Sequence, residues 1–227
     1  MKYIKKFNNE TERQNYLGNN FVVPHIHLEA ENDIIYYMSR MIPIEYLENH
    51  NSEFIDTGVY ATNLTHAIIK GQFNDSSTDY NNFGAGTLED DGGAKNRFQI
   101  ICKSNSQFHF GVGTKYLNAR MHDKDPHTFE LYGNGTAKID DETYNVSNAD
   151  LVQTSKTIYL FAINNTNINK GKKIRIYSCK IYEDDELILD LIPVRIGQIG
   201  YMYDKIQNKI LKNKGTGDFI LGPDINE

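Results

Sequence analysis

Short strand-like segments recur along almost the whole chain, and this repetition constrains the fold more than any other feature. The segments are rich in Ile, Val, Tyr, Phe and Thr and are bounded by Gly, Asn and Asp, a pattern typical of strands and turns. One helix is predicted, Asn9–Tyr16, with Asn9 as its cap and Gly18 just past its end. The sequence therefore predicts an all-β fold, with the clearest strands at Thr65–Phe73, Arg97–Lys103, Gln107–Val112, His127–Tyr132, Thr136–Ile139, Thr157–Ala162, Lys173–Glu183, Glu186–Arg195 and Ile199–Asp204.

Two hairpins are predicted from their turn residues. In YEDDELILDLIPV the turn is expected at Glu183–Asp185, and the apolar strand after it should be covered on both faces, as inside a two-layer sandwich. In YGNGTAKIDDETY, Gly133–Gly135 offers residues that accept positive φ, and Asp140–Asp141 turns the chain back.

A change in composition near Arg40–Pro43 divides the chain. Residues 1–42 are expected to form a small N-terminal attachment module, of α+β or β type, at the lower size limit for independent stability. Residues 43–227 are expected to form the sandwich. The module needs a neighbour, and its apolar residues Phe21, Val23, Ile35 and Tyr37 are candidates for an attachment interface.

Charge and composition exclude some functional classes. A net charge of -6 argues against a general nucleic-acid binder, which needs a clustered positive face. No apolar run approaches the roughly 18 residues of a membrane helix, and no apolar segment follows the basic N-terminus, so neither a membrane span nor a secretory signal is expected. Cys102 and Cys179 lie in apolar strands and are predicted to be buried, reduced thiols.

Five stretches, taken in order, resemble a known family: YLENHNSEFIDTGVY, TIYLFAIN, GKKIRIYSCKIYEDDELILDLIPVR, GYMYDKIQNKIL and NKGTGDFILGP. They are similar to the concanavalin A-like, laminin-G-like sandwich modules of bacteriophage virion proteins and of surface proteins of gut bacteria, over Ile44–Pro223. The opening MKYIKKFN resembles the leading module of structural proteins of Bacteroidales phages, the crAss-like group included.

The resemblance implies a concanavalin A-like jelly-roll sandwich. SEFIDTGVY would be its first long strand, with Asp56 and Thr57 at the strand end and Gly58 turning the chain. GTGDFILGP would be the closing strand, which pairs the end of the domain with its beginning.

The same sandwich hosts glycoside hydrolases, and an enzyme of this kind would need two carboxylates on one face of a strand. No Glu-x-Asp-x-Glu segment occurs, and Glu183–Glu186 falls in a predicted turn. A Gly-x-Ser-x-Gly elbow and a phosphate-binding loop are missing as well. The sequence therefore predicts that the protein is not an enzyme and uses no cofactor.

Acidic residues offer weak candidates for calcium ligands. Glu89–Gly93 is an acidic loop, but it lacks the EF-hand spacing. Asp56, Asp123 and Asp125 could add oxygen ligands only if folding brought them together. A loop without an ion is the favoured interpretation.

The histidines do not form a metal signature either. His25 and His27 would share one face of a strand, but two ligands are too few for a closed zinc site. His109 should face away from its aromatic neighbours, and His122 and His127 flank an acidic turn and are expected to be solvated. No metal site is predicted.

Two polar loops, residues 74–86 and 163–171, could recognise sugars. They combine side-chain amides and carboxylates, which can fix hydroxyl groups, with aromatic rings that stack on sugar C–H surfaces. Ordinary solvated loops are the alternative, and the chain has no Trp. The candidate glycan-binding residues are Asp79, Tyr80, Asn82, Phe83, Asn165 and Asn167.

The resemblance implies a non-enzymatic structural protein of a phage virion, assembled in the host cytoplasm: a capsid decoration, head-fibre or tail-associated protein. Its expected partners are other virion proteins, bound through the N-terminal module, and copies of itself in a homo-oligomer such as a trimer. Neither nucleic acid nor membrane is an expected partner. The alternative function is a carbohydrate-binding module or adhesin that recognises host surface glycans.

Overall fold

The computed structural model describes residues 26–30, 33–37, 41–74, 81–85, 96–102, 107–165, 168–171 and 173–225. Within these ranges every regular element is a β-strand, which confirms the all-β prediction. The predicted helix Asn9–Tyr16 lies outside the described residues.

Two large antiparallel sheets make up most of the structure. The 6-stranded sheet has the order β10 (Lys115–Met121), β9 (Gln107–Gly113), β8 (Arg97–Cys102), β7 (Asn81–Ala85), β14 (Gln153–Leu160), β5 (Ile55–Thr62). The 11-stranded sheet has the order β13 (Glu142–Asn145), β12 (Thr136–Ile139), β11 (His127–Tyr132), β6 (Thr65–Phe73), β17 (Ile174–Glu183), β18 (Glu186–Ile196), β19 (Ile199–Asp204), β20 (Lys209–Leu211). Its remaining strands are β3 (Met41–Pro43), β4 (Leu47–Glu48) and β21 (Ile220–Leu221), and two small sheets pair β1 (Ile26–Ala30) with β2 (Asp33–Tyr37) and β15 (Ala162–Ile163) with β16 (Asn169–Lys170).

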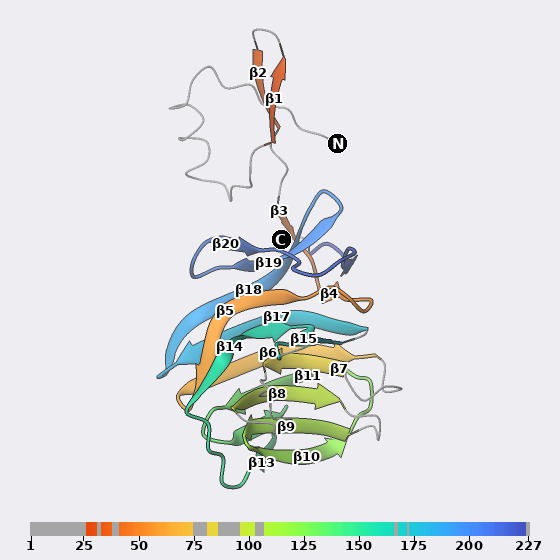
Figure 1. Ribbon diagram of the computed structural model, residues 1–227. Helices are drawn as coiled ribbons and strands as arrows, with labels where there is room; N and C mark the ends of the chain where they lie inside the picture. Colours follow the sequence, from red (N-terminus) through yellow and green to blue (C-terminus); the bar gives the residue numbers. More distant parts are fainter. Residues whose placement is uncertain are drawn as a thin grey trace.

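The two large sheets lie one behind the other (Figure 1) and share one hydrophobic core. Phe108 of β9 contacts Phe129 of β11, with ring centroids 5.0 Å apart. Strands supply this core because successive side chains point to opposite faces: β6 buries Thr65 and every second residue after it up to Phe73. The arrangement is consistent with the predicted β-sandwich, and "the sandwich" below means these two sheets.

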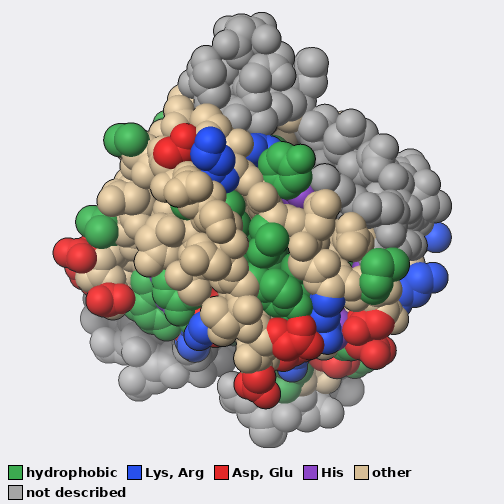
Figure 2. Space-filling model, turned by 90° about the horizontal axis from the view of Figure 1, so that it is seen from below, with side chains coloured by type: hydrophobic (Ala, Val, Ile, Leu, Met, Phe, Trp, Pro, Cys, Tyr) green, Lys and Arg blue, Asp and Glu red, His purple; other side chains and the backbone are tan. Residues whose placement is uncertain are grey.

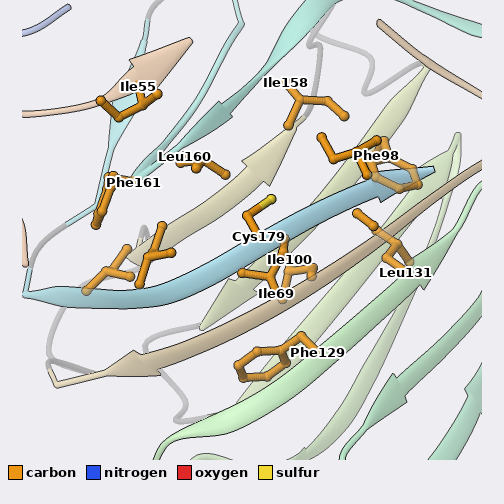
Figure 3. Close-up of a cluster of buried hydrophobic side chains, with 14 of the residues drawn as sticks. Ile55, Ile69, Phe98, Ile100, Phe129, Leu131, Ile158, Leu160, Phe161 and Cys179 are labelled. Atoms are coloured by element: carbon orange, nitrogen blue, oxygen red, sulfur yellow. The ribbon is translucent and has the colours of Figure 1, made fainter. Parts of the chain in front are cut away.

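Both cysteines are buried and neither forms a disulfide, as predicted. Cys179 of β17 lies among core side chains of both sheets, including Ile69 and Ile100 (Figure 3). Burial raises the pKa of the Cys179 thiol, and the carboxylate of Asp190 acts in the same direction. The thiol is therefore kept in its protonated, unreactive form.

The hairpin predicted from YEDDELILDLIPV is present as β17 and β18. Asp184 and Asp185 have φ values of 50° and 65°, as the favoured two-residue hairpin turns require. Three successive residues of β18, Leu189–Leu191, are buried, so this part of the strand is covered on both faces as expected.

The second predicted hairpin differs in its turn. Of Gly133–Gly135 only Gly135 has a positive φ, 97°, and Asp140 makes the return turn with a φ of 51°. Gly133 is needed for another reason, because a Cβ there would lie 2.0 Å from the carbonyl oxygen of Thr62.

The prediction that the first long strand ends at Asp56 and Thr57 is wrong. β5 continues through Gly58, which has a φ of 76°, and the register with β14 shifts at this point. Asp56 Oδ1 accepts the N–H of Gly58 at 2.9 Å, and Thr57 Oγ1 donates to the carbonyl of Ile158 at 2.8 Å. These bonds hold a bulge, so the glycine bends the strand without ending it.

The closing strand pairs as the resemblance implied. In β21, Ile220 is opposite Glu48 and Leu221 is opposite Leu47 of β4. An isolated bridge also joins Ile44 to Asp224. The start of the sandwich, at β3, and its C-terminal end consequently lie close together (Figure 1).

The N-terminal hairpin places two of the predicted attachment residues. Ile35 and Tyr37 lie on β2, opposite Leu28 and Ile26 of β1. Phe21 and Val23 lie outside the described residues. Met41–Pro43 pairs with β18, so the larger sheet begins at or before the predicted domain boundary.

Candidate functional site

The structure brings together the two segments predicted to bind sugars. Asn82 and Phe83 lie at successive positions of β7, opposite Ile101 and Ile100 of β8, rather than in a loop. Asn165 follows β15, which lies against β7, and it is only 4% exposed. Asp79, Tyr80 and Asn167 lie outside the described residues.

Beside β7, the outer face of the 6-stranded sheet carries a cluster of polar and aromatic side chains. Their neighbours in β8 and β9, such as Phe98 and Phe110, point into the core, so alternate positions of each strand face outward. We call this cluster the Tyr116 face; it consists of Arg97 and Gln99 of β8, His109 of β9, and Tyr116 and Asn118 of β10.

Tyr116 and Asn118 are the exposed members of the cluster, and Tyr116 has 58% of its surface accessible. Its ring stacks on that of His109, with centroids 5.0 Å apart and planes inclined by 26°. His109 is buried, faces away from Phe108 and Phe110 as predicted, and approaches Asn118 Oδ1 with its Nδ1 at 3.1 Å. The exposed ring therefore rests on a hydrogen-bonded support.

Gly111 lets this support pack closely. A Cβ at this position would lie 2.9 Å from Cγ and from Nε2 of Gln99. Because glycine leaves that space empty, the Gln99 side chain can lie across β9 beside Tyr116, which is opposite Gly111 on β10.

Arg97 forms the other border of the Tyr116 face. Its Nε donates to the carbonyl of Gly113 at 3.2 Å, and its Nη2 donates to the carbonyl of Thr114. The guanidinium carbon lies 5.5 Å from the centre of the Tyr116 ring, a cation–π distance. Burial lowers the pKa of Arg97, although Tyr116 and Asp150 act in the opposite direction.

The turn between β9 and β10 is held from both sides. Gly113 has a φ of 61°, and a Cβ there would lie 2.1 Å from Asp150 Oδ1. Asp150 accepts the Thr114 N–H at 2.7 Å and the Thr114 hydroxyl at 2.6 Å, and these bonds lower the pKa of Asp150. Thr114 donates its amide and its hydroxyl to Asp150, and the carbonyls of Gly113 and Thr114 accept hydrogen bonds from Arg97. These bonds fix the start of β10.

A second cluster overturns the expectation that His127 is solvated. His127 is 7% exposed, with Nδ1 2.7 Å from Asp140 Oδ2 and Nε2 2.7 Å from Asp123 Oδ1. It lies two residues before the inward-facing Phe129 on β11 and so shares its buried face, which explains its burial. Arg120 of β10 pairs with Asp140 at 3.3 Å and with Glu142 of β13 at 3.4 Å, so the cluster joins edge strands of both sheets.

Two carboxylates of this cluster, Asp123 and Asp140, have lowered pKa values. Burial raises the pKa of Asp123, but hydrogen bonds from His127 and from the Asp125 amide outweigh it and lower the pKa. The pKa of Asp140 is lowered in the same way, by hydrogen bonds from the Thr128 amide and from His127. Figure 2 shows acidic side chains gathered beside basic ones at this end of the molecule. The geometry supports a structural role, in which acidic and basic side chains from the two sheets neutralise each other's charge.

His122 is also not solvated as expected. It is partly buried, its Nε2 lies 2.5 Å from the carbonyl oxygen of Phe73, and its ring meets that of Phe108 edge to face. Burial lowers the pKa of His122.

The calcium hypothesis gains no support from the acids that are described. Asp56 holds the Gly58 amide, whereas Asp123 holds His127 and the Asp125 amide. Within the described ranges, no group of three or more His, Cys, Asp or Glu side chains could hold a metal ion. Glu89–Gly93 lies outside those ranges.

The outer face of the larger sheet carries a row of stacked rings. His66 lies 3.8 Å from Tyr132 with planes inclined by 9°, and 5.4 Å from Tyr182. Glu130 accepts the Tyr132 hydroxyl at 2.8 Å and Lys138 at 3.3 Å; burial and this carboxylate raise the pKa of Tyr132 to about 12. Because the rings cover one another's faces, the row is a cross-strand ladder rather than a platform for a ligand.

Compared with protein-family models and with curated protein sequences, the chain matches none. In the part of the chain that the structure describes, no helix has the length and apolar character needed to cross a membrane.

The sequence interpretation missed Arg97 and Tyr116 as site residues. The signal for Tyr116 was the alternation in KYLNARM, where Leu117 and Ala119 separate Tyr116, Asn118 and Arg120. The position of Arg97 depends on the β9–β10 turn, 16 residues further along the chain, and no local pattern reports such a contact.

Proposed function

We propose that the protein is a non-enzymatic phage virion protein whose concanavalin A-like jelly-roll sandwich recognises glycans through the Tyr116 face. The observation that carries the proposal is the Tyr116 ring, which is 58% exposed and stacks on His109. Aromatic rings held in this way are the usual partners of the C–H surfaces of sugars.

The surroundings of Tyr116 supply the polar contacts that a sugar needs. Asn118 carries an exposed side-chain amide, which both donates and accepts hydrogen bonds, and Gln99, which is largely buried, carries a second amide in the same cluster. The contacts to His109 and across Gly111 hold these groups before a ligand arrives, which reduces the entropy lost on binding. The segments predicted to bind sugars are close to this cluster in the fold. β7 pairs with β8, and β15 lies against β7.

The location in a virion rests on the resemblance of Ile44–Pro223 to phage sandwich modules. The pairing of β21 with β4, which that resemblance implied, supports it. In this proposal the N-terminal module, with Ile35 and Tyr37 on β2, attaches the protein to other virion proteins and to further copies of the chain. A homo-oligomer such as a trimer would present several Tyr116 faces together and so strengthen weak single-site binding.

A glycan array tests the recognition. The full-length protein should bind a set of glycans, and Tyr116→Ala should weaken that binding about fivefold or more, since a stacked ring contributes on the order of 1 kcal/mol or more. Tyr60→Ala is the matched control, because Tyr60 is a tyrosine of β5 in the same sheet and is 48% exposed. Equal losses in both variants, or no binding by the folded wild type, would contradict the proposal.

Quantitative mass spectrometry of purified particles tests the location. A fixed ratio of this chain to the major capsid protein is expected, and its value would separate a capsid decoration from a fibre present in few copies. Absence from particles would leave a host-surface glycan-binding protein, the alternative, as the function.

A further inference from the structure

We infer that the sugar bound at the Tyr116 face carries a carboxylate, as uronic and sialic acids do. This inference rests on the proposed function and adds the charge of the ligand to it. Its basis is the chemical situation of Arg97.

Arg97 is 9% exposed, and a buried guanidinium is ordinarily paired with an acid. Its hydrogen bonds go to two neutral acceptors, the carbonyls of Gly113 and Thr114. A guanidinium has five N–H donors, so donors remain for another group. Among the described residues no carboxylate forms an ion pair with it.

The other described arginines differ from Arg97 in this respect. Arg120 pairs with Asp140 at 3.3 Å, and Arg195 pairs with Asp224 at 2.6 Å. Arg175 pairs with Glu48. Described acids therefore pair with each of these three, whereas within the described ranges the guanidinium of Arg97 bonds to backbone oxygens only.

Asp150, the acid that influences Arg97 most, is already engaged. Its two carboxylate oxygens accept the amide and the hydroxyl of Thr114, at 2.7 and 2.6 Å. It acts on Arg97 over a distance and raises its pKa, but burial outweighs this influence. Asp150 fixes the turn to which Arg97 is bound and leaves the remaining guanidinium donors for a ligand.

The position of the cation suits a sugar acid. The guanidinium lies beside the Tyr116 ring, 5.5 Å from its centre, so a substituent of a sugar stacked on the ring comes within its reach. The planar guanidinium matches a carboxylate with two parallel hydrogen bonds. Its orientation is fixed in advance by Gly113 and Thr114, which favours such a contact.

Titration calorimetry with matched ligands tests the inference on the full wild-type chain. The probes are tri-galacturonic acid with its carboxyl-reduced counterpart, and sialyllactose with lactose. At least one acidic probe should bind about tenfold or more tightly than its neutral counterpart, as a charge-assisted hydrogen bond predicts. The difference should shrink as salt is raised, and the preferred pair identifies the sugar acid as uronic or sialic.

The outcomes separate this inference from the proposed function. Equal affinities for acidic and neutral partners would overturn the carboxylate and leave glycan binding in place. Failure of the folded protein to bind any of the four probes or any glycan on the array would overturn both.

Substitution of Arg97 gives an independent check. Arg97→Lys keeps the charge but loses the planar pair of donors, and the preference for the acidic probe should fall severalfold while the neutral counterpart binds as before. Arg195→Lys is the matched control, since Arg195 belongs to an ion pair on β18 in the other sheet. An unchanged preference in Arg97→Lys and in Arg97→Gln, with native urea midpoints, would overturn the role of Arg97.

Discussion

Asn49 and Ile174 are hydrogen-bonded in both directions. The Asn49 amide donates to the Ile174 carbonyl at 3.2 Å, and the Ile174 amide donates to Asn49 Oδ1 at 2.9 Å. Asn49 Nδ2 also donates to the carbonyl of Gly171 at 2.6 Å. The side chain is fully buried, so it ties the beginning of β17 to the segment that follows β4.

Asn49→Ala should therefore destabilise the fold strongly. The substitution leaves the Ile174 amide and the Gly171 carbonyl without these partners, and we expect a loss of about 2 to 4 kcal/mol in the free energy of unfolding. Urea denaturation measures it. Asn51→Ala is the control, because Asn51 is exposed and two residues away, and it should change the free energy of unfolding by less than about 0.5 kcal/mol. Similar losses in both variants would refute a stabilising role for the hydrogen bonds of the Asn49 side chain.

Glu53 should contribute to stability in a pH-dependent way. Its Oε2 accepts the amides of His50, Asn51 and Ser52 at 2.9 to 3.2 Å. Burial raises the pKa of Glu53, but these backbone hydrogen bonds outweigh it, and the pKa lies below its ordinary value. A lowered pKa means that the contribution is present above the unfolded pKa of about 4.3 and is lost as the pH falls through the folded one.

We expect Glu53→Gln to lower the free energy of unfolding by about 1 to 2 kcal/mol near neutral pH. The variant should also lose less stability than the wild type on acidification below about pH 5. Urea midpoints at a series of pH values measure both effects, with the exposed Glu186→Gln as control. Parallel pH profiles for wild type and Glu53→Gln would refute the assignment.

His66 and His122 should make the protein sensitive to mild acid. Burial lowers the pKa of both side chains, against the opposing effects of Glu130 on His66 and of the Phe73 carbonyl on His122. Because the folded state favours the neutral rings, stability is complete above the unfolded pKa of about 6.5 and falls as the pH drops below it.

The urea midpoint should accordingly decline between about pH 7.5 and 5.5, and His122→Gln should reduce the decline. His50→Gln is the control, because the His50 side chain is 61% exposed. A midpoint that is constant or rises across this range would contradict the prediction.

The two thiols should report global unfolding. Cys102 and Cys179 are buried thiols outside any disulfide, and the raised pKa of Cys179 disfavours its reactive thiolate. In native buffer a thiol-disulfide reagent should label neither residue on the time scale of minutes, and in guanidinium it should label both at once. Rapid labelling of native protein would mean that the core around β8 and β17 opens locally.

Local sequence patterns predicted the central strands well. Thr65–Phe73, His127–Tyr132, Thr136–Ile139 and Ile199–Asp204 are observed with the predicted bounds, because each alternates strictly or is bounded by turn residues. β10 was not predicted: it is an edge strand with mostly exposed residues, so its apolar alternation is weak. The strand predicted to end at Ala162 ends at Leu160, because Phe161 adopts a φ of 67°.

The candidate site could be predicted only in part. The segments around Asn82 and Asn165 were identified by composition, and the structure places β7 and β15 together. The Tyr116 face required the register of three strands and the turn that Arg97 and Asp150 hold. The contact of His127 with Arg120 likewise depends on the pairing of β10, whose register changes after Asn118. Such relationships come from sheet pairing, which local periodicity does not encode.

The bridge between Ile44 and Asp224 has a mechanical consequence. The chain enters and leaves the sandwich at the same end, where Arg195 also holds Asp224. Tension applied between the two ends of the sandwich would first break the short contact between Ile44 and Asp224. The long strands further inside would not carry this load at first. The far end of the sandwich, with the β9–β10 turn, lies away from this contact (Figure 1) and would keep its shape.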